Sequence, residues 1–324
     1  MTRLTPFVAM SVLLWLSSLA MAQSNDDIEA LREAAKKSFN PRKIGAGYAA
    51  IINFAVSPDI STATFHADAG EGIVDPTLKV TRVPFRKVFD KERDGPRPFI
   101  GGLFAYQNID SGFVPLPNEQ IDAEWQTYGA TLSGGVEIPV GEAWKLFPTL
   151  SLGFGSLDNR ARYSGPVSET YLRPALQGIV FDWDAKALVY GAAFGASYEY
   201  KSPKLRIEAL SSLTYHRVQS FDTAADFQSF RGDVTAFDIE LNFVRPTRMK
   251  IDKYPLAVVA LLGNTTFLGA NRDALGFKDF FEAGLALEAD VSSRGWKIHT
   301  LRLGAKSIVG GDVHGWSLIL SYGY

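Results

Sequence analysis

The stretch "GWSLILSYGY", Gly315 to Tyr324, alternates between two kinds of residue. Its even-numbered members are large and mostly apolar, and the residues between them are small apart from Ile319. Successive side chains of a β-strand point to opposite faces of the sheet, so the stretch predicts a strand with one bulky apolar face. The bulky set is Trp316, Leu318, Leu320, Tyr322 and Tyr324.

The same alternation occurs along most of the chain from Ile44 onward and predicts an all-β domain. Pro84 and Pro98 interrupt two of the segments, and residues 61–66 could belong to an extended first hairpin. The predicted strands are 44–56, 77–90, 97–107, 121–138, 144–157, 185–201, 203–217, 232–245, 254–268, 278–292, 296–308 and 312–324.

The connections between the segments decide which face is buried. Short connections alternate with mostly longer ones, and aromatic residues cluster near the short turns, as in outer-membrane barrels. The segments are also longer than the ~9–11 residues that a tilted strand needs to cross a bilayer. We therefore predict a twelve-stranded antiparallel transmembrane β-barrel, and a soluble secreted β protein is the alternative. The longer connections span 57–76, 108–120, 158–184, 218–231, 269–277 and 309–311.

The first residues resemble a secretory signal. Arg3 precedes the apolar run "FVAMSVLLWLSSLAMA", Phe7 to Ala22, which ends in small residues and predicts cleavage after Ala22. The run is short for a transmembrane anchor. The predicted organisation is a signal peptide at 1–22, a helix and linker at 23–43 and the barrel at 44–324, with the mature N-terminus in the periplasm.

A charged helix is predicted between Ser24 and Pro41, with acids in its first turn and lysines in its last. Its apolar stripe of Ile28, Leu31 and Ala35 is thin, which favours a polar, wet cavity over a hydrophobic core. We therefore expect this α-helix in the barrel lumen. The charges that would line the pore are Glu29, Arg32, Glu33, Lys36 and Lys37.

Charged residues also fall on the predicted lumen faces of the strands. Paired acids could serve acid–base catalysis or bind a metal, but basic residues on neighbouring strands balance them, so we interpret the set as a lumen lining. No catalytic, cofactor-binding or metal-binding residue is assigned. The predicted lumen charges are Glu137, Glu199, Arg206, Glu208, Asp238, Glu240, Glu282, Glu288, Asp290, Arg302 and Lys306.

The composition narrows the remaining functions. The net charge of −2 gives no basic stripe for a nucleic acid, and the absence of Cys excludes disulfides and thiol nucleophiles. The four histidines lie in no metalloprotease motif, and no G-x-S-x-G is present. A lumenal hydrolase built on His216 with Ser212 and Thr214 is kept as the least favoured alternative.

The chain resembles the translocator domains of autotransporters, which are twelve-stranded barrels with a helix in the pore. The resemblance covers residues 26–324: "DDIEALREAAKKSFN" stands in the place of the pore helix and "IGAGYAAIINFAV" in that of the first strand. The C-terminal stretch resembles the signal read by the barrel-assembly machinery, with Tyr324 in place of the usual Phe. Few residues separate Ala22 from the first strand, so we do not expect passenger export.

These observations predict a monomeric barrel in the outer membrane of a Gram-negative bacterium, with outer-membrane lipid as its surroundings. Its function is expected to be structural, or that of a pore plugged by its own helix, with surface loops free for interaction. An open channel for small solutes is the alternative.

Overall fold

The protein is described here as a computed structural model. The signal peptide, the first strand expected at 44–56 and Tyr324 lie outside the described residues. The described residues are 25–38, 59–67, 73–89, 95–269, 272, 277–292 and 298–323.

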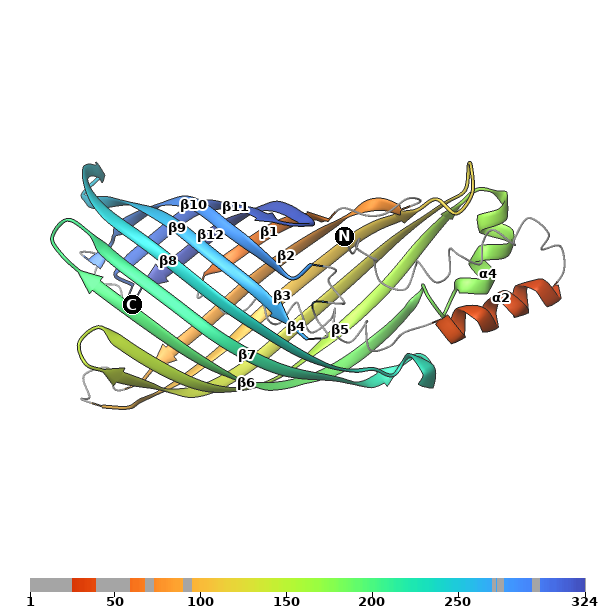
Figure 1. The fold of residues 1–324 in the computed structure, drawn as a ribbon, viewed down its shortest axis with the longest axis horizontal. Helices are drawn as coiled ribbons and strands as arrows, with labels where there is room; N and C mark the ends of the chain where they lie inside the picture. The colour runs from red at the N-terminus through yellow and green to blue at the C-terminus, as the bar shows by residue number, and fades with distance from the viewer. Residues whose placement is uncertain are drawn as a thin grey trace.

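The structure is a closed barrel of twelve antiparallel strands with an N-terminal helix, as the sequence predicted (Figure 1). Each strand pairs with its neighbours in sequence, and β1 pairs with β12 to close the barrel. The strands are β1 (Ile60–Ala67), β2 (Ile73–Val88), β3 (Arg97–Phe113), β4 (Gln120–Val140), β5 (Trp144–Ser164), β6 (Trp183–Lys201), β7 (Arg206–Thr223), β8 (Arg231–Ile251), β9 (Tyr254–Leu268), β10 (Asp279–Asp290), β11 (Thr300–Gly310) and β12 (Val313–Gly323).

The count of twelve strands is confirmed, whereas residues 44–56, expected to form the first strand, lie outside the described residues. The strand that pairs with both β12 and β2 is Ile60–Ala67. The run at 61–66 therefore forms the closing strand itself. β2 and β3 also run through Pro84 and Pro98, which keep cross-strand partners in the ladder.

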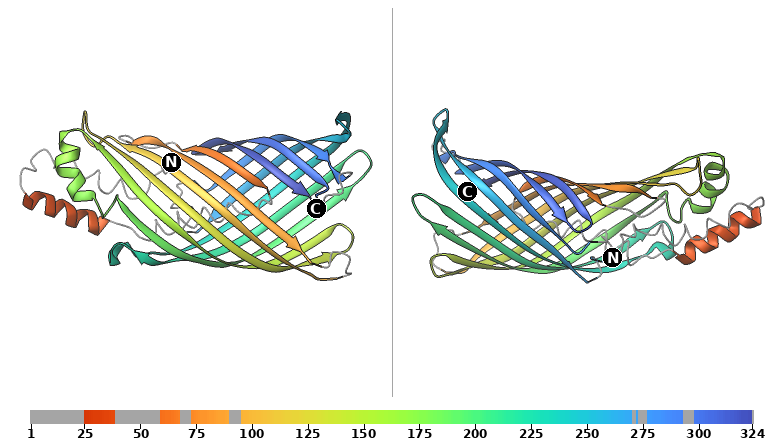
Figure 2. Two further views of the ribbon diagram at one scale, coloured as in Figure 1. Left: turned by 180° about the vertical axis from the view of Figure 1, so that it is seen from behind. Right: turned by 45° about the horizontal axis from the view of Figure 1, so that its top comes forward.

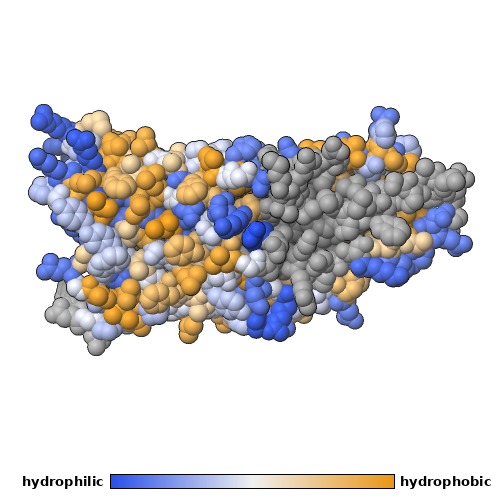
Figure 3. Space-filling view, viewed as in Figure 1, coloured by the Kyte–Doolittle hydropathy of each residue, from blue (hydrophilic) through white to orange (hydrophobic). Residues whose placement is uncertain are grey.

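The C-terminal strand has the expected two faces. Trp316, Leu318 and Leu320 point outward and are 48%, 50% and 42% exposed, whereas Ser317 and Ile319 point inward and are 3% exposed. Figure 3 shows apolar side chains spread over the wall near the C-terminal end, with hydrophilic residues at its rim. Large apolar groups outside and charges inside are typical of a barrel in a membrane.

Several strands reverse their faces along their length. On β5 the outward Leu152 and Phe154 are 57% and 64% exposed, but further on Asp158 and Arg160 take the outward positions and Leu157 is buried inward. β5 has 21 residues, about twice the ~9–11 that a tilted strand needs to cross a bilayer. The wall from β3 to β8 therefore continues beyond the apolar belt as a sheet with polar outside and apolar inside.

This extension corrects the bounds of the predicted loops at 108–120, 158–184 and 218–231, because both ends of each are strand. β3, β5 and β7 end only at Phe113, Ser164 and Thr223. The sequence also alternates in these extensions, but there the polar residues take the outward positions and the apolar residues the inward ones, the reverse of the belt. The end of the barrel that carries these connections is called the long-loop end, and the opposite end, where β12 finishes, the short-turn end (Figures 1 and 2).

The helix α2 (Asn25–Ser38) lies at the long-loop end, beyond the strand ends, and packs against α4 (Arg173–Leu176) (Figure 1). The prediction that it would lie in the lumen is therefore wrong. Its thin stripe contacts an apolar cluster, with Ala35 only 3% exposed and Ile28 and Leu31 packed beside it. An apolar surface of matching size stabilises this stripe better than a charged lumen would. None of the described helices is long and apolar enough to cross a membrane.

Candidate functional site

Several of the predicted lumen charges form ion pairs between strands inside the barrel. Arg302 Nη2 on β11 lies 2.6 Å from Glu288 Oε2 on β10 and 2.9 Å from Glu208 Oε2 on β7. Arg206 on β7 completes the group, with its Nη2 2.6 Å from Glu288 Oε1 and its Nε 2.7 Å from Glu208 Oε1. We call Arg206, Glu208, Glu288 and Arg302 the lumen quartet.

The position of the quartet constrains the shape of the lumen. Two strands, β8 and β9, separate β7 from β10 in the wall. Neighbouring strands lie ~4.8 Å apart, so β7 and β10 are ~14 Å apart along the sheet, too far for contacts within the wall. The side chains therefore meet inside the barrel, where their ion pairs occupy part of the lumen.

A second group lies further along the same lumen. Lys306 Nζ on β11 is 3.2 Å from Glu240 Oε2 on β8 and 3.5 Å from Glu282 Oε2 on β10, and Lys306 is 4% exposed. Asp238 accepts a hydrogen bond from Thr265 Oγ1 at 2.7 Å. A cavity of about 50 Å³ beside these acids is also lined by Arg82. It has room for a few water molecules, which suits a polar interior.

A third group, around Glu137, combines charges with aromatic rings. Glu137 carboxylate oxygens lie 3.3 Å from Arg86 Nη2 and 3.4 Å from Lys145 Nζ. The Arg86 guanidinium carbon is 4.1 Å from the centroid of the Phe99 ring and 5.0 Å from that of Phe147, within the range of cation–π contacts. The Phe99 ring occupies space that a side chain at residue 135 would need, so Gly135 is required there.

The sequence prediction included Glu137 but missed the basic residues around it. Arg86 stands two residues after Pro84, where the proline obscured the alternation and the inward register of β2. Two other predicted lumen residues lie at the short-turn rim. Glu199 is paired with Lys201, and Asp290 accepts hydrogen bonds from the backbone and hydroxyl of Ser292.

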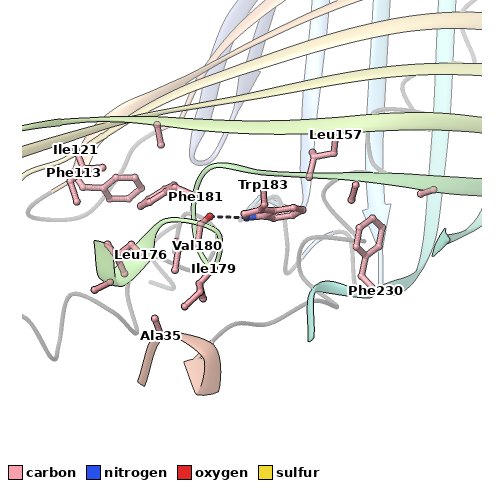
Figure 4. Packing of buried hydrophobic residues seen from close by; sticks show 14 of the residues in the cluster. Ala35, Phe113, Ile121, Leu157, Leu176, Ile179, Val180, Phe181, Trp183 and Phe230 are labelled. Carbon is pink, nitrogen blue, oxygen red and sulfur yellow. Dashed lines mark hydrogen bonds between the residues drawn. The ribbon is translucent and has the colours of Figure 1, made fainter. Parts of the chain in front are cut away.

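An apolar cluster fills the inside of the extended wall at the long-loop end (Figure 4). The connection between β5 and β6, with η2 (Ser168–Leu172) and α4, folds into this cluster. Trp183 is 1% exposed and donates its Nε1–H to the Val180 carbonyl at 3.0 Å. We call residues 165–182 the mouth loop, since they cover the interior at this end.

Polar contacts fix the mouth loop to the wall. Asn159, which is fully buried, accepts the Asp182 N–H at 3.1 Å. Glu119 accepts the N–H groups of Val167 and Ser168 at 3.2 and 2.6 Å. Burial alone would raise the pKa of the Glu119 carboxyl, but these backbone donors outweigh it and hold its pKa below the ordinary value. Glu119 is therefore a charged anchor at neutral pH.

The helix charges predicted to line the pore have other roles. Arg32 donates to the carbonyls of Pro174 and Gln177 at 2.8 and 3.2 Å and so ties α2 to the mouth loop. Lys36 pairs with Glu33 on the helix surface at 2.6 Å. Glu29 and Lys37 are exposed.

The histidine considered for a hydrolase has a partner other than those predicted. His216 Nε2 lies 2.9 Å from Ser151 Oγ on β5 and reaches it across Gly191 on β6. Ser212 and Thr214 lie on the same inward face and are buried. The described hydrogen bond of His216 therefore joins it to a serine on another strand, and not to either of the two residues that the sequence suggested.

The C-terminal residues split between lipid-facing and rim positions. Trp316, Leu318 and Leu320 form part of the outer apolar belt, and Tyr322 donates its hydroxyl to the Pro84 carbonyl on β2 at 3.3 Å. Two further aromatic pairs border the belt on other strands. Trp144 packs on Tyr198 with ring centroids 4.9 Å apart, and Tyr106 packs on Tyr128 at the same distance.

Comparison with known proteins agrees with this architecture. The β domain of the Bordetella autotransporter BrkA is 15% identical with a TM-score of 0.51, covering 82% of this chain and 96% of its own. The translocator domain of the autotransporter NalP from Neisseria meningitidis is 11% identical with a TM-score of 0.53, covering 97% and 99%. At these identities the likeness shows the fold alone, and a search of curated proteins gives no match.

A family model gives the assignment. The model of the solitary outer membrane autotransporter beta-barrel domain matches residues 75–324. Because this match spans more than half of the 324 residues, the chain belongs to the family of solitary outer-membrane autotransporter β-barrel domains.

Proposed function

We propose that this protein is a closed structural barrel of the outer membrane whose interactions take place at its long-loop end. The observation that carries the proposal is the lumen quartet, in which Arg302 on β11 and Glu208 on β7 meet across the interior. The mouth loop and α2 supply a second barrier. In this proposal the wall side chains close the pore, and the helix only covers the mouth.

The environment follows from the family. We propose that the barrel-assembly machinery inserts it through the C-terminal strand, that outer-membrane lipid contacts the belt, and that the barrel is a monomer. The short-turn end then faces the periplasm and the long-loop end the exterior. An open small-solute channel remains the second candidate, because a cavity with polar and charged walls lies within the lumen.

Single-channel recording in planar bilayers separates the closed barrel from the channel. We expect both the mature chain and a variant lacking residues 23–40 to be closed, because the lumen quartet remains. Steady conductance is expected only when that deletion is combined with a shortened mouth loop and with alanine at all four quartet positions.

The matched control is Asp233→Asn, which breaks an outward-facing ion pair of 2.6 Å with Arg217 and should leave conductance unchanged. Steady conductance of the correctly folded mature chain would contradict the proposal and favour the open channel. Labelling of Ser151 by a serine-reactive probe would instead support the hydrolase.

The side on which α2 lies can be tested by cysteine labelling. The sequence predicted a periplasmic N-terminus, whereas the contact of α2 with the mouth loop supports an exterior position. The chain has no Cys, so single-cysteine variants give clean signals. With a bulky, membrane-impermeant maleimide on intact cells, we expect Glu29→Cys on α2 to react and Glu142→Cys in a short turn to stay unlabelled. The reverse pattern would place α2 in the periplasm.

A further inference from the structure

Two histidines face each other on the outer surface where the barrel closes. His66 on β1 and His314 on β12 are direct cross-strand partners, and their rings are stacked with centroids 5.5 Å apart and planes 29° from parallel. They share the outward face with Thr64 and Trp316, which are also cross-strand partners. His314 is exposed and His66 is partly buried. The pair is thus open to solvent or to the headgroup region.

The hydrogen bonding of the pair leaves nitrogen atoms free for another partner. Thr77 Oγ1 on β2 lies 3.3 Å from His66 Nδ1. Among the described residues, no hydrogen bond reaches His66 Nε2 or either ring nitrogen of His314. A histidine that binds a metal commonly donates its other N–H to a neighbouring oxygen, and Thr77 stands in that place.

We propose that His66 and His314 bind one divalent transition-metal ion, such as Zn²⁺, Ni²⁺ or Cu²⁺, which joins β1 to β12. Neutral imidazole suits these ions. The described residues hold no group of three or more His, Cys, Asp or Glu side chains that could hold a metal, so among them the proposed ligands are the two imidazoles. Water completes the coordination, as expected for an exposed surface site.

The position of the pair gives the ion a role. The β1–β12 ladder is short, running from Ile60 opposite Leu320 to Ala67 opposite Val313, and the histidines lie one residue from its end. The two residues are far apart in sequence, so the paired site exists only when the barrel is closed. An ion bound there stabilises the closing seam by mass action. This role holds whether the lumen is closed or open.

The test is metal titration of the refolded full-length barrel in detergent, followed by calorimetry. We expect one Zn²⁺ or Cu²⁺ per chain, and a loss of affinity of at least about tenfold in His66→Asn and in His314→Asn, since a single imidazole keeps only one ligand bond. At an ion concentration 100 times Kd, the unfolding equilibrium should shift ~100-fold toward the folded barrel. The Cu²⁺ form should show two equatorial nitrogens by electron paramagnetic resonance.

Two further variants make the result specific. His299→Asn, at the short-turn end, should bind metal like the wild type. Thr77→Val should weaken binding by ~10–100-fold without abolishing it, because it removes only the oxygen that orients His66. No binding by the wild type at millimolar ion, or undiminished binding in the double variant of His66 and His314, would overturn the proposal.

Discussion

Arg302→Met is expected to be the most damaging single substitution in the lumen. It leaves Glu208 and Glu288 to share Arg206 alone, and Glu288 is only 5% exposed. Breaking a buried ion pair by removing one partner costs ~3–5 kcal/mol, because a charge stays buried without compensation. We expect a loss of this size in the free energy of unfolding, measured by urea titration of the protein in lipid vesicles.

The matched control is Lys186→Met, which removes one member of an outward ion pair with Asp222 at 2.8 Å. Both side chains are about half exposed, at 53% and 54%, so solvent screens their attraction and the loss should be much smaller than that of Arg302→Met. Replacing all four quartet residues by apolar side chains of similar volume should recover much of the stability. Equal losses for Arg302→Met and Lys186→Met would show that the quartet is solvated, as in an open pore.

The sequence predicted the strands of the barrel because the alternation of apolar and polar residues along a strand is a local pattern. Alternation such as that from Trp316 to Tyr322 is visible in one strand without knowledge of the others. Locality also explains why the strand that closes the barrel could not be identified from the sequence. Both 44–56 and 61–66 alternate, and only the pairing with β12 and β2 shows that the second run closes the barrel.

The charge network in the lumen could be predicted only in part. The inward charges followed from strand register, but their partners depend on the shape of the barrel cross-section. Glu208 and Arg302 stand on strands that are far apart in sequence, and nothing local shows that they meet. The same holds for His216, whose predicted neighbours on its own strand gave way to Ser151 two strands away.

The helix was misplaced for a related reason. Its charges suited a polar lumen, and the apolar surface that α2 contacts is created by the mouth loop and the extended strands. That surface could have been anticipated from Trp183, Ala185 and Ala187, which alternate inward just after the loop and are at most 1% exposed. Apolar residues at inward positions near the long-loop end predict that the connecting loop packs over the barrel interior there.

Trp183→Ala is expected to release the mouth loop from the wall while the barrel stays folded. Trp183 packs edge-on against Trp125 with centroids 6.0 Å apart and lies within the apolar cluster that holds the mouth loop. Truncating a buried Trp to Ala typically costs ~3–5 kcal/mol. If the mouth loop opens locally, its open population should rise on the order of 10²–10⁴-fold. Chymotrypsin should then cut after Leu176 or Phe181, which are only 2% and 4% exposed while the mouth loop is closed.

The comparison that makes this result specific is Trp144→Ala at the short-turn end. Trp144 is 50% exposed and faces outward, so its loss should leave cleavage in the mouth loop unchanged. Proteolysis follows the open population when opening and closing are fast relative to cutting. The ratio of the cleavage rates of the two variants therefore reports how much Trp183 stabilises the closed mouth loop. Equal and rapid cleavage of both variants and of the wild type would mean that the mouth loop is already open, whereas equally slow cleavage would mean that Trp183 does not hold it closed. In the case of rapid cleavage, the lumen quartet alone of the two proposed barriers would close the pore.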